Sequence, residues 1–312
     1  MVIISIISLA KGSVYISNKD IWLAIFQQGE EINQTIIRDL RLPRLMASLL
    51  VGSSLGMSGA LLQGMLKNGL ASPYLLGISA GSGLVIVFFI SFGLTQSFIP
   101  FAAWLGAVLT TLIVFILSRD GNKIIVERLV LGGVAVSSLF GAIQATLLLQ
   151  VEDGRIQAAL NWLIGSLNAR GWQDIKFVAL PILIALFIGL FLSRQLNLLS
   201  LGDELSVSLG NSLFRSRCLI GAVATLLTAC AVSIGGLIGF IGLVVPHFSR
   251  LIIGNDFRYI LPFSALIGAF TLSSADLISR LGPVEIPVGI VTALIGAPVF
   301  MLILYRNKVI KK

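Results

Sequence analysis

The sequence has few residues able to bind a metal ion, form a disulfide or carry a charge. Its 312 residues include two cysteines and one histidine, and only 12% are charged. Cys218 and Cys230 lie on one apolar segment, and a helix there would hold them roughly 18 Å apart, too far for a disulfide. His247 alone cannot form a histidine-rich site. We therefore expect this chain to bind no metal and no cofactor.

The sequence also lacks a phosphate-binding loop, a soluble domain and a low-complexity linker. These absences argue against an enzyme that hydrolyses nucleotides by itself. The net charge is +8, but the basic residues are spread over both predicted faces of the membrane. Nucleic-acid binding, which requires a clustered basic surface, is therefore not indicated.

Apolar residues are abundant instead: 56% of the chain is hydrophobic and the mean hydropathy is +1.00, too apolar for a soluble domain. A helix needs about 20 residues to cross roughly 30 Å of hydrocarbon. The sequence predicts an all-α polytopic membrane protein, a single domain over residues 1–312 with about ten transmembrane helices. The predicted spans are 2–10, which is short and partly interfacial, then 42–65, 74–95, 99–118, 129–150, 172–193, 215–235, 237–253, 260–279 and 287–305.

The lysines and arginines predict the orientation of these spans. With the N-terminus inside, the inner loops hold more basic residues than the outer loops, as the positive-inside rule requires. Arg41, Arg44 and Arg280 nevertheless end spans on the exported side. An arginine at a span end often only anchors the helix by reaching toward water, so anchoring and recognition both remain open.

A polar segment between two apolar ones predicts a short helix that projects from the membrane, at about residues 198–213. Ser200 is a candidate N-cap, and Gly210 can end the helix. Asp203 and Glu204 fall in the first turn, where the helix dipole favours negative charge. A helix lying on lipid would carry lysine or arginine on its polar face, so docking on another protein is favoured. The apolar stripe of this helix is Leu201, Leu205, Leu209 and Leu213.

Small residues recur at every fourth position in two predicted spans, which allows close helix packing; a pathway wall is the alternative. Glycine and proline also break the apolar segments at residues 69–83 and 234–247. The breaks fall at corresponding places in the two halves, which indicates an internal repeat of the transporter kind. The small residues are Ser48, Gly52, Gly56, Ala60 and Gly64, and then Gly289, Ala293 and Ala297.

Six motifs between residues 36 and 306 share one family pattern. They are RLPR (41–44), GALLQGMLKNGLASPYLLGISAGSG (59–83), LGDELSVSLG (201–210), GFIGLVVPHFSRLIIGNDFRYILP (239–262), ADLISR (275–280) and EIPVG (285–289). Together they resemble the FecCD or cobalamin-permease type of permease subunit, found in bacterial ABC importers for iron–siderophore complexes, heme and cobalamin. The chain departs from the family in having Ser206 where alanine is usual, and in its short first span.

The resemblance implies the cobalamin-permease-like fold of type II importers, in the bacterial inner (plasma) membrane. It implies transport of a ferric siderophore or a related iron, heme or cobalamin chelate, and we favour a ferric siderophore. The implied partners are a second permease subunit, identical or paralogous, two ATPase subunits that use ATP, and a periplasmic or lipid-anchored substrate-binding protein.

The resemblance also implies roles for residues. Arg41, Arg44 and Arg280 would receive glutamates of the binding protein, which would set orientation and association rate more than affinity. ATPase coupling is implied for Leu201, Gly202, Asp203, Glu204, Leu205, Ser206, Leu209 and Gly210. The pathway should have a weakly polar wall, and the candidates for it are Met57, Gln63, Ser79, Ser82, Gln144 and Ser166.

Asp276 is an acid within an apolar span, four residues before Arg280. Such an acid is costly and normally paired, so we expect a structural pair in preference to a proton relay. The alternative function is an ion-coupled secondary transporter, but it needs several ionisable residues at mid-membrane, and this chain offers essentially Asp276. A purely structural membrane subunit would leave the broken helices and the exported arginines unexplained. For His247 we expect a packing or hydrogen-bonding role.

Overall fold

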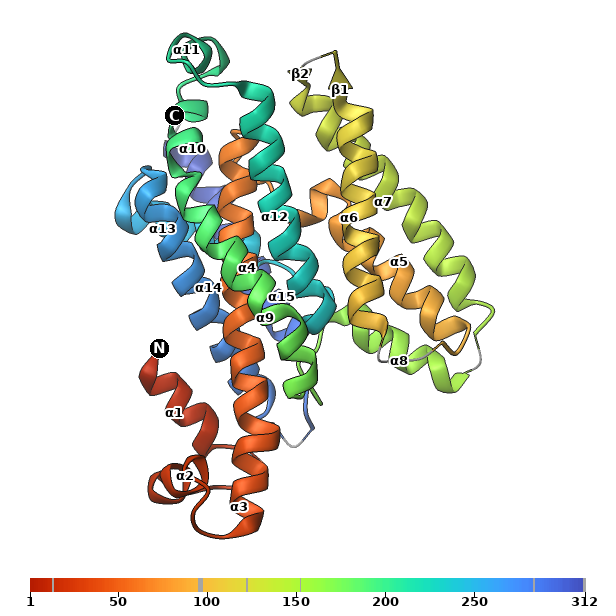
Figure 1. The fold of residues 1–312 in the computed structure, drawn as a ribbon, viewed down its shortest axis with the longest axis vertical. Helices are drawn as coiled ribbons and strands as arrows, with labels where there is room; N and C mark the ends of the chain where they lie inside the picture. The colour runs from red at the N-terminus through yellow and green to blue at the C-terminus, as the bar shows by residue number, and fades with distance from the viewer. Residues whose placement is uncertain (13, 95–97, 122, 152, 283, 311–312) are drawn as a thin grey trace.

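The computed structural model describes residues 1–12, 14–94, 98–121, 123–151, 153–282 and 284–310, and most of these residues are helical (Figure 1). A two-stranded antiparallel hairpin, β1 (Arg119–Asp120) and β2 (Lys123–Ile124), joins two of the helices. The helices are α1 (Val2–Ala10), α2 (Asn18–Ile25), α3 (Glu31–Thr35), η1 (Ile36–Arg41), α4 (Leu42–Met65), η2 (Pro73–Leu76), α5 (Ile78–Ser91), α6 (Ile99–Ser118), α7 (Val126–Leu148), α8 (Asp153–Ile164), α9 (Trp172–Phe191), α10 (Ser193–Ser200), α11 (Asp203–Ser208), α12 (Leu213–Gly235), α13 (Ile241–Ile253), α14 (Phe257–Ser279) and α15 (Val288–Ile310).

Two long helices, α4 and α12, form the centre of the bundle. Within the 18-residue apolar stretch of each helix, 83% of the residues are buried for α4 and 78% for α12, but only 17% for α7. In Figure 1, α4 runs through the middle of the molecule, and α5, α6 and α7 form a group beside it. The outer helices therefore present apolar side chains to lipid or to another subunit, as expected when backbone groups are satisfied within each helix.

Close backbone contacts explain one stripe of small residues. A Cβ added at Gly52 would lie 2.4 Å from the carbonyl oxygen of Gly268 on α14, and one added at Gly59 would lie 1.9 Å from that of Gly242 on α13. Larger side chains would force these helices apart. The packing role predicted for the α4 stripe is therefore confirmed.

The two predicted breaks precede short helices. After α4 the chain passes through η2 and then Gly77, which has φ +72°, before α5 begins. After α12 it turns at Gly236, with φ +69°, and at Phe240, with φ +66°, before α13 begins. Because these positive φ values cannot continue a right-handed helix, α5 and α13 are only 14 and 13 residues long.

The predicted spans agree closely with the helices. The spans 42–65 and 99–118 coincide with α4 and α6, and the other seven long spans each overlap one of α5, α7, α9, α12, α13, α14 and α15. Six described helices are long and apolar enough to cross a membrane, and α5, α13 and the part of α15 from Val288 to Ile303 are shorter apolar helices. The segment 2–10 forms α1, which at nine residues is too short to cross alone.

Candidate functional site

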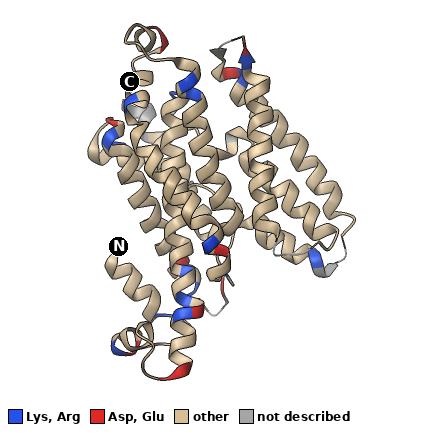
Figure 2. Cartoon of the chain, in the orientation of Figure 1, with Lys and Arg blue, Asp and Glu red and all other residues tan. Residues whose placement is uncertain are grey.

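Charged residues gather at the two ends of the helices, and the middle of the bundle is nearly free of them (Figure 2). One end carries α11 and the β1–β2 hairpin, and we call it the α11 end. The opposite end carries α2 and α3, and we call it the α2 end (Figure 1). Predicted functional residues lie at both ends, so each end is a candidate site.

The projecting helix at the α11 end is shorter than the predicted segment 198–213. It covers only Asp203–Ser208, because Leu198–Ser200 belong to α10 and Gly202 has φ +110°. Ser200 is not its N-cap: the hydroxyl of Ser200 donates to the carbonyl oxygen of Asn197 at 2.6 Å. Gly210 does follow the helix with φ +81°, as predicted for a glycine at the C-terminal end.

Helix α11 presents apolar side chains outward. Leu201, Leu205 and Leu209 are 53%, 58% and 57% exposed, and Val207 is exposed as well. Apolar side chains grouped on a projecting helix are unusual in a surface that faces only water. They form a candidate contact surface.

Asp203 faces its own chain instead of outward. Its carboxylate accepts from Lys67 Nζ at 2.5 Å and from Arg217 Nη2 at 2.9 Å, which ties α11 to the end of α4 and to α12. Arg217 Nη1 also donates to the carbonyl oxygen of Ile124 in β2 at 3.0 Å. We call Lys67, Asp203 and Arg217 the Asp203 tether.

Two effects act on the pKa of Asp203. Burial raises it, but the hydrogen bonds from Lys67 and Arg217 and the charges of both outweigh burial and hold it below the ordinary value of 3.8. Asp203 is therefore a carboxylate at neutral pH. Its neighbour Glu204 is exposed and has no hydrogen bond or ion pair among the described residues. The two acids of the predicted first turn thus have different roles.

A second set of hydrogen bonds holds the base of α11. Ser206 is fully buried and its hydroxyl accepts from Asn211 Nδ2 at 2.8 Å. Asn211 Oδ1 in turn accepts from the Ser216 hydroxyl at 2.6 Å, at the start of α12. Ser206 therefore has a polar partner, which an alanine at this position would lack.

At the α2 end, Arg44 lies at the centre of a buried ion network. Its Nε and Nη2 both lie 2.8 Å from Asp276 Oδ1, and its Nη1 lies 2.5 Å from Glu285 Oε1. Arg280 Nη2 lies 3.2 Å from Asp276 Oδ2, which confirms the predicted pair of Asp276 and Arg280. The contact with Arg44 was not predicted, because 232 positions separate the two residues.

Arg41 and Arg280 also hold α1. Arg41 Nη1 donates to the carbonyl oxygens of Leu9 at 2.6 Å and Ala10 at 3.1 Å, which are orphan acceptors at the C-terminal end of α1. Arg280 Nη2 donates to the Ser8 hydroxyl at 2.6 Å. All three candidate docking arginines therefore have partners within the chain, and Arg41 and Arg44 are 7% and 9% exposed.

The three arginines line one cavity of about 730 Å³ at the α2 end. Its lining includes four arginines, Arg41, Arg44, Arg170 and Arg280, against two acids, Asp39 and Glu285. Arg170 was missed by the sequence analysis. Its guanidinium lies 4.2 Å from the ring centre of Trp162, and a stacking contact of that kind leaves no periodic signal in a sequence. The lining carries excess positive charge.

The two chain breaks meet at a second cavity, of about 810 Å³. Ser72, Pro73 and Tyr74 of the first break and Leu237 to Phe240 of the second line it. The small residues Gly289, Ala293 and Ala297 of α15 form another wall, so these separate sequence features come together in space. Irregular backbone beside a cavity is the arrangement expected of a transport protein.

The pathway candidates do not form one wall. Ser79 lines the cavity at the breaks, and Gln63 lines another cavity near the α11 end. Met57 and Ser82 are buried between helices, and the Ser82 hydroxyl donates to the carbonyl oxygen of Ala103 at 2.8 Å. The other two also have local partners: Gln144 donates to the carbonyl oxygen of Ala80, and the Ser166 hydroxyl accepts from the backbone N–H of Asn168.

Comparison with known proteins agrees with this architecture. The FecCD transport family matches residues 1–306. The chain is 34% identical to the probable siderophore transport system permease protein YfhA of Bacillus subtilis, over 97% of this chain and 91% of that protein. It is 38% identical to the Fe(3+)-citrate import system permease protein YfmE of Bacillus subtilis, over 97% of this chain and 92% of that protein.

A solved structure shares the whole fold. It shows a metal-chelate type ABC transporter in an inward-facing conformation, and it matches with a TM-score of 0.89 at 34% identity. The match covers 98% of this chain and 96% of that chain. The chain therefore belongs to the FecCD transport family and is a multi-span membrane permease.

Proposed function

We propose that this chain is the permease subunit of a binding-protein-dependent ABC importer that moves a ferric siderophore or a related iron chelate inward. The observation that supports the proposal is that the α11 end and the α2 end of the molecule present different kinds of surface. One end presents apolar residues on a tethered helix, and the other presents a cavity with an excess of arginine. An importer needs two such docking surfaces, for the ATPase inside and for the binding protein outside.

The α11 end would seat an ATPase subunit. Leu205 and Leu209 would enter a groove of the partner as buried anchors, and Glu204, which is exposed, would face basic groups at its rim. Asp203 would act indirectly, by holding α11 in place through Lys67 and Arg217. ATP hydrolysis would then reside in the partner, and this chain would bind neither ATP nor another cofactor.

The α2 end would receive acidic groups of a substrate-binding protein. Arg41, Arg44 and Arg280 are bonded within the chain, so their part in docking would be mainly the positive potential of the cavity they line. Arg170 has no carboxylate within ion-pair distance among the described residues, so it would be the better direct partner. A second permease subunit, identical or paralogous, would cover part of the exposed apolar surface of α7.

The alternative of an ion-coupled carrier loses its main support. The carboxylate of Asp276 is 1% exposed and is held by ion pairs with Arg44 and Arg280, so it has a structural role within the chain. A relay would need a partner that changes protonation, and this acid has two permanent charges beside it.

Uptake of a panel of labelled ferric siderophores, ferric citrate, heme and cobalamin, in cells with and without this gene, tests the cargo. We expect gene-dependent uptake of at least one ferric siderophore that stops when the partner ATPase carries an inactive nucleotide site. Gene-dependent uptake that continues without ATP hydrolysis but collapses with the membrane potential would support the carrier instead.

A further inference from the structure

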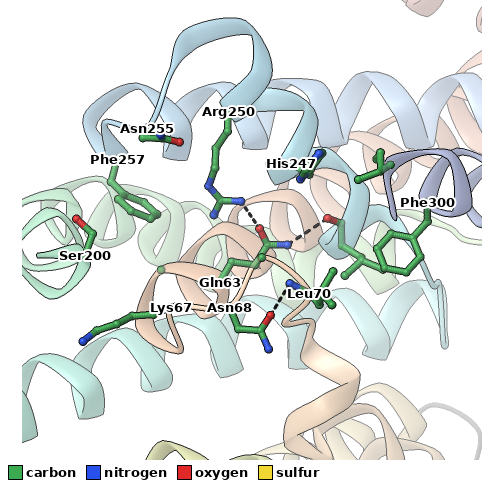
Figure 3. Close-up of a pocket in the computed structure, with 14 residues that line it drawn as sticks. Gln63, Lys67, Asn68, Leu70, Ser200, His247, Arg250, Asn255, Phe257 and Phe300 are labelled. Carbon is green, nitrogen blue, oxygen red and sulfur yellow. Dashed lines mark hydrogen bonds between the residues drawn. The ribbon is translucent and has the colours of Figure 1, made fainter. Parts of the chain in front are cut away.

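A cavity of about 720 Å³ lies at the α11 end, between the end of α4, the C-terminal half of α13 and helix α15 (Figure 3). None of its 14 described lining residues is acidic. Its polar lining consists of three basic side chains, three amides and one hydroxyl: Lys67, His247 and Arg250, then Gln63, Asn68 and Asn255, and Ser200. We call it the Arg250 cavity.

The guanidinium of Arg250 reaches from α13 toward Gln63 across this cavity (Figure 3). Its Nη1 donates to Gln63 Oε1 at 2.5 Å, and its carbon lies 5.9 Å from the ring centre of Phe257. Gln63 is itself fixed, because its Nε2 donates to the carbonyl oxygen of Leu243 at 3.1 Å. The position of the positive charge is thus set by neutral groups.

No carboxylate among the described residues lies within ion-pair distance of Arg250. Other basic residues at the same end differ. Lys67 is paired with Asp203, and Arg258 lies 2.7 Å from Asp256 Oδ2. A partly buried cation that keeps only neutral partners pays a desolvation cost that a bound anion would offset.

The volume of the cavity suits a small organic molecule, since such sites commonly enclose about 300–1,000 Å³. Phe257 and Phe300 provide aromatic surface, and Leu243 and Ile303 provide aliphatic surface. Inorganic ions are much smaller than this space. The lining therefore fits a small organic anion, bound through a carboxylate, and the carbon-rich walls can also contact an apolar part where the ligand has one.

We infer that the Arg250 cavity is a weak site for carboxylate-bearing ligands, occupied by the anionic part of a chelate as it leaves the permease at the α11 end. This inference rests on the proposed function for its direction of transport. A single guanidinium already bonded to an amide gives modest affinity, and modest affinity is what an exit site needs if cargo is to be released.

The first test is binding of citrate, measured by its effect on thermal unfolding of the purified full-length chain in detergent, with sodium chloride at equal ionic strength as reference. We expect citrate to stabilise the wild type, and Arg250→Gln to weaken the apparent affinity about tenfold, as for loss of one charged hydrogen bond. Arg258→Gln is the matched control, because Arg258 lies at the same end outside the cavity, and it should bind citrate normally.

Asn255→Asp gives a second variant that does not endanger the fold, because Asn255 is exposed in the loop before α14. It places a negative charge in the lining and should also weaken citrate binding. Equal stabilisation of all four proteins, or no stabilisation of the wild type beyond the salt reference, would overturn the site. This test needs no transport, so it is independent of the proposed function.

The second test separates departing cargo from free cellular anions. In proteoliposomes that contain the assembled importer, Arg250→Gln should slow uptake of ferric citrate by several-fold and leave a neutral ferric hydroxamate, delivered by its own binding protein, unchanged. If Arg250→Gln slows uptake of both chelates, or of neither, then the site does not act on departing cargo. If wild-type proteoliposomes transport neither chelate, the proposed function fails while the citrate result still stands.

Discussion

The two ends of this permease use the same kinds of charged residue in opposite ways. At the α2 end, Arg44 and Arg280 are both paired with Asp276 in the interior, and Asp276 is 1% exposed. At the α11 end, the paired acid Asp203 is 41% exposed and its partners hold a projecting helix. The charges of the first end stabilise the fold, whereas those of the second position a surface for something outside the chain.

This difference shows that the location of a charge in the sequence does not reveal its role. The arginines at span ends looked available for recognition, and the acids of α11 looked directed toward a partner. Contacts within the chain occupy Arg41, Arg44 and Asp203, and they leave Arg170 and Glu204 facing cavity or solvent. Arg170, which has no ion pair among the described residues, and Glu204, which is exposed, are the residues expected to meet another protein.

The largest effect should come from Arg44→Ala. It leaves Asp276 with Arg280 alone and removes the partner of Glu285. Removal of one member of a buried pair costs about 3–5 kcal/mol, so we expect low abundance in the membrane and a much lower melting temperature. The control is Arg258→Ala, whose side chain is 71% exposed and whose loss should cost little.

The double variant Arg44→Leu, Asp276→Leu sharpens this test. It removes the buried carboxylate together with its partner, so abundance should recover in part compared with Arg44→Ala. If Arg44→Ala is as abundant and as stable as the wild type, the interpretation of the α2 end as a closed structural network is wrong.

The next effect is on assembly and not on folding. Leu205 is 58% exposed, so Leu205→Asp should leave the isolated permease as stable as the wild type. If Leu205 is a buried anchor in the complex, the change should weaken ATPase binding by about 30-fold or more, the effect of losing a hot spot of about 2 kcal/mol. Co-purification measures it, and Leu149→Asp, at an exposed leucine after α7, is the control. Undiminished co-purification with Leu205→Asp would contradict docking on α11.

Asp203→Asn should have a smaller effect, confined to coupling. The pairs of Asp203 are partly exposed, so their contribution to stability is about 0–1 kcal/mol and is screened by salt. We expect normal folding but a lower ratio of transported chelate to hydrolysed ATP. Glu204→Gln, one position away and without a partner among the described residues, should keep the ratio. Equal ratios for both variants would contradict the positioning role of Asp203.

The pH dependence of the tether follows from its lowered pKa. A carboxyl whose pKa is lower when folded stabilises the fold above its unfolded value, here about 3.8. That contribution is lost as pH falls through the lower folded value. Titration of Asp203 should therefore not alter the ratio of transported chelate to hydrolysed ATP between pH 6 and 8. A change of that ratio in this range would point to another titrating group.

Much of this architecture could be predicted because a bilayer requires long apolar helices, which are easily recognised in a sequence. Apolar length alone located α4 and α6 exactly, and α12 and α14 within a few residues. Glycine and proline located the two breaks, since a positive φ at Gly77 or Gly236 has a strong residue preference.

What could not be predicted depends on contacts between distant segments. Nothing near Arg44 in the sequence indicates Asp276, and nothing near Asp203 indicates Lys67. The predicted coupling helix was too long because the pattern of leucines continues across Gly202, where the backbone leaves the helix. Periodicity reports which residues share a face, but a single glycine decides where the helix begins.

The smallest effect, and the one that compares anchoring with recognition most directly, is expected from Arg41→Lys. Lysine keeps the charge but cannot reach all of the carbonyl oxygens of Leu9, Ala10 and Val14 that the guanidinium fork now holds. If Arg41 is an anchor of α1, stability should fall by about 1–2 kcal/mol, and the dependence of ATP hydrolysis on binding-protein concentration should not change. Gly12→Ala should have the same effect, because its Cβ would lie 2.9 Å from Arg41 Nη2 and would displace the side chain.

Arg170→Gln should have the opposite effect. Arg170 lines the same cavity without an ion pair among the described residues, so its loss should weaken stimulation by the binding protein and leave the melting temperature nearly unchanged. The loss should shrink at high salt, since exposed charges are screened over about 8 Å at physiological ionic strength. If Arg41→Lys weakens stimulation in a salt-dependent way and Arg170→Gln does not, then the buried arginine is the recognition residue. The α2 end would in that case have to open its internal network when the binding protein docks.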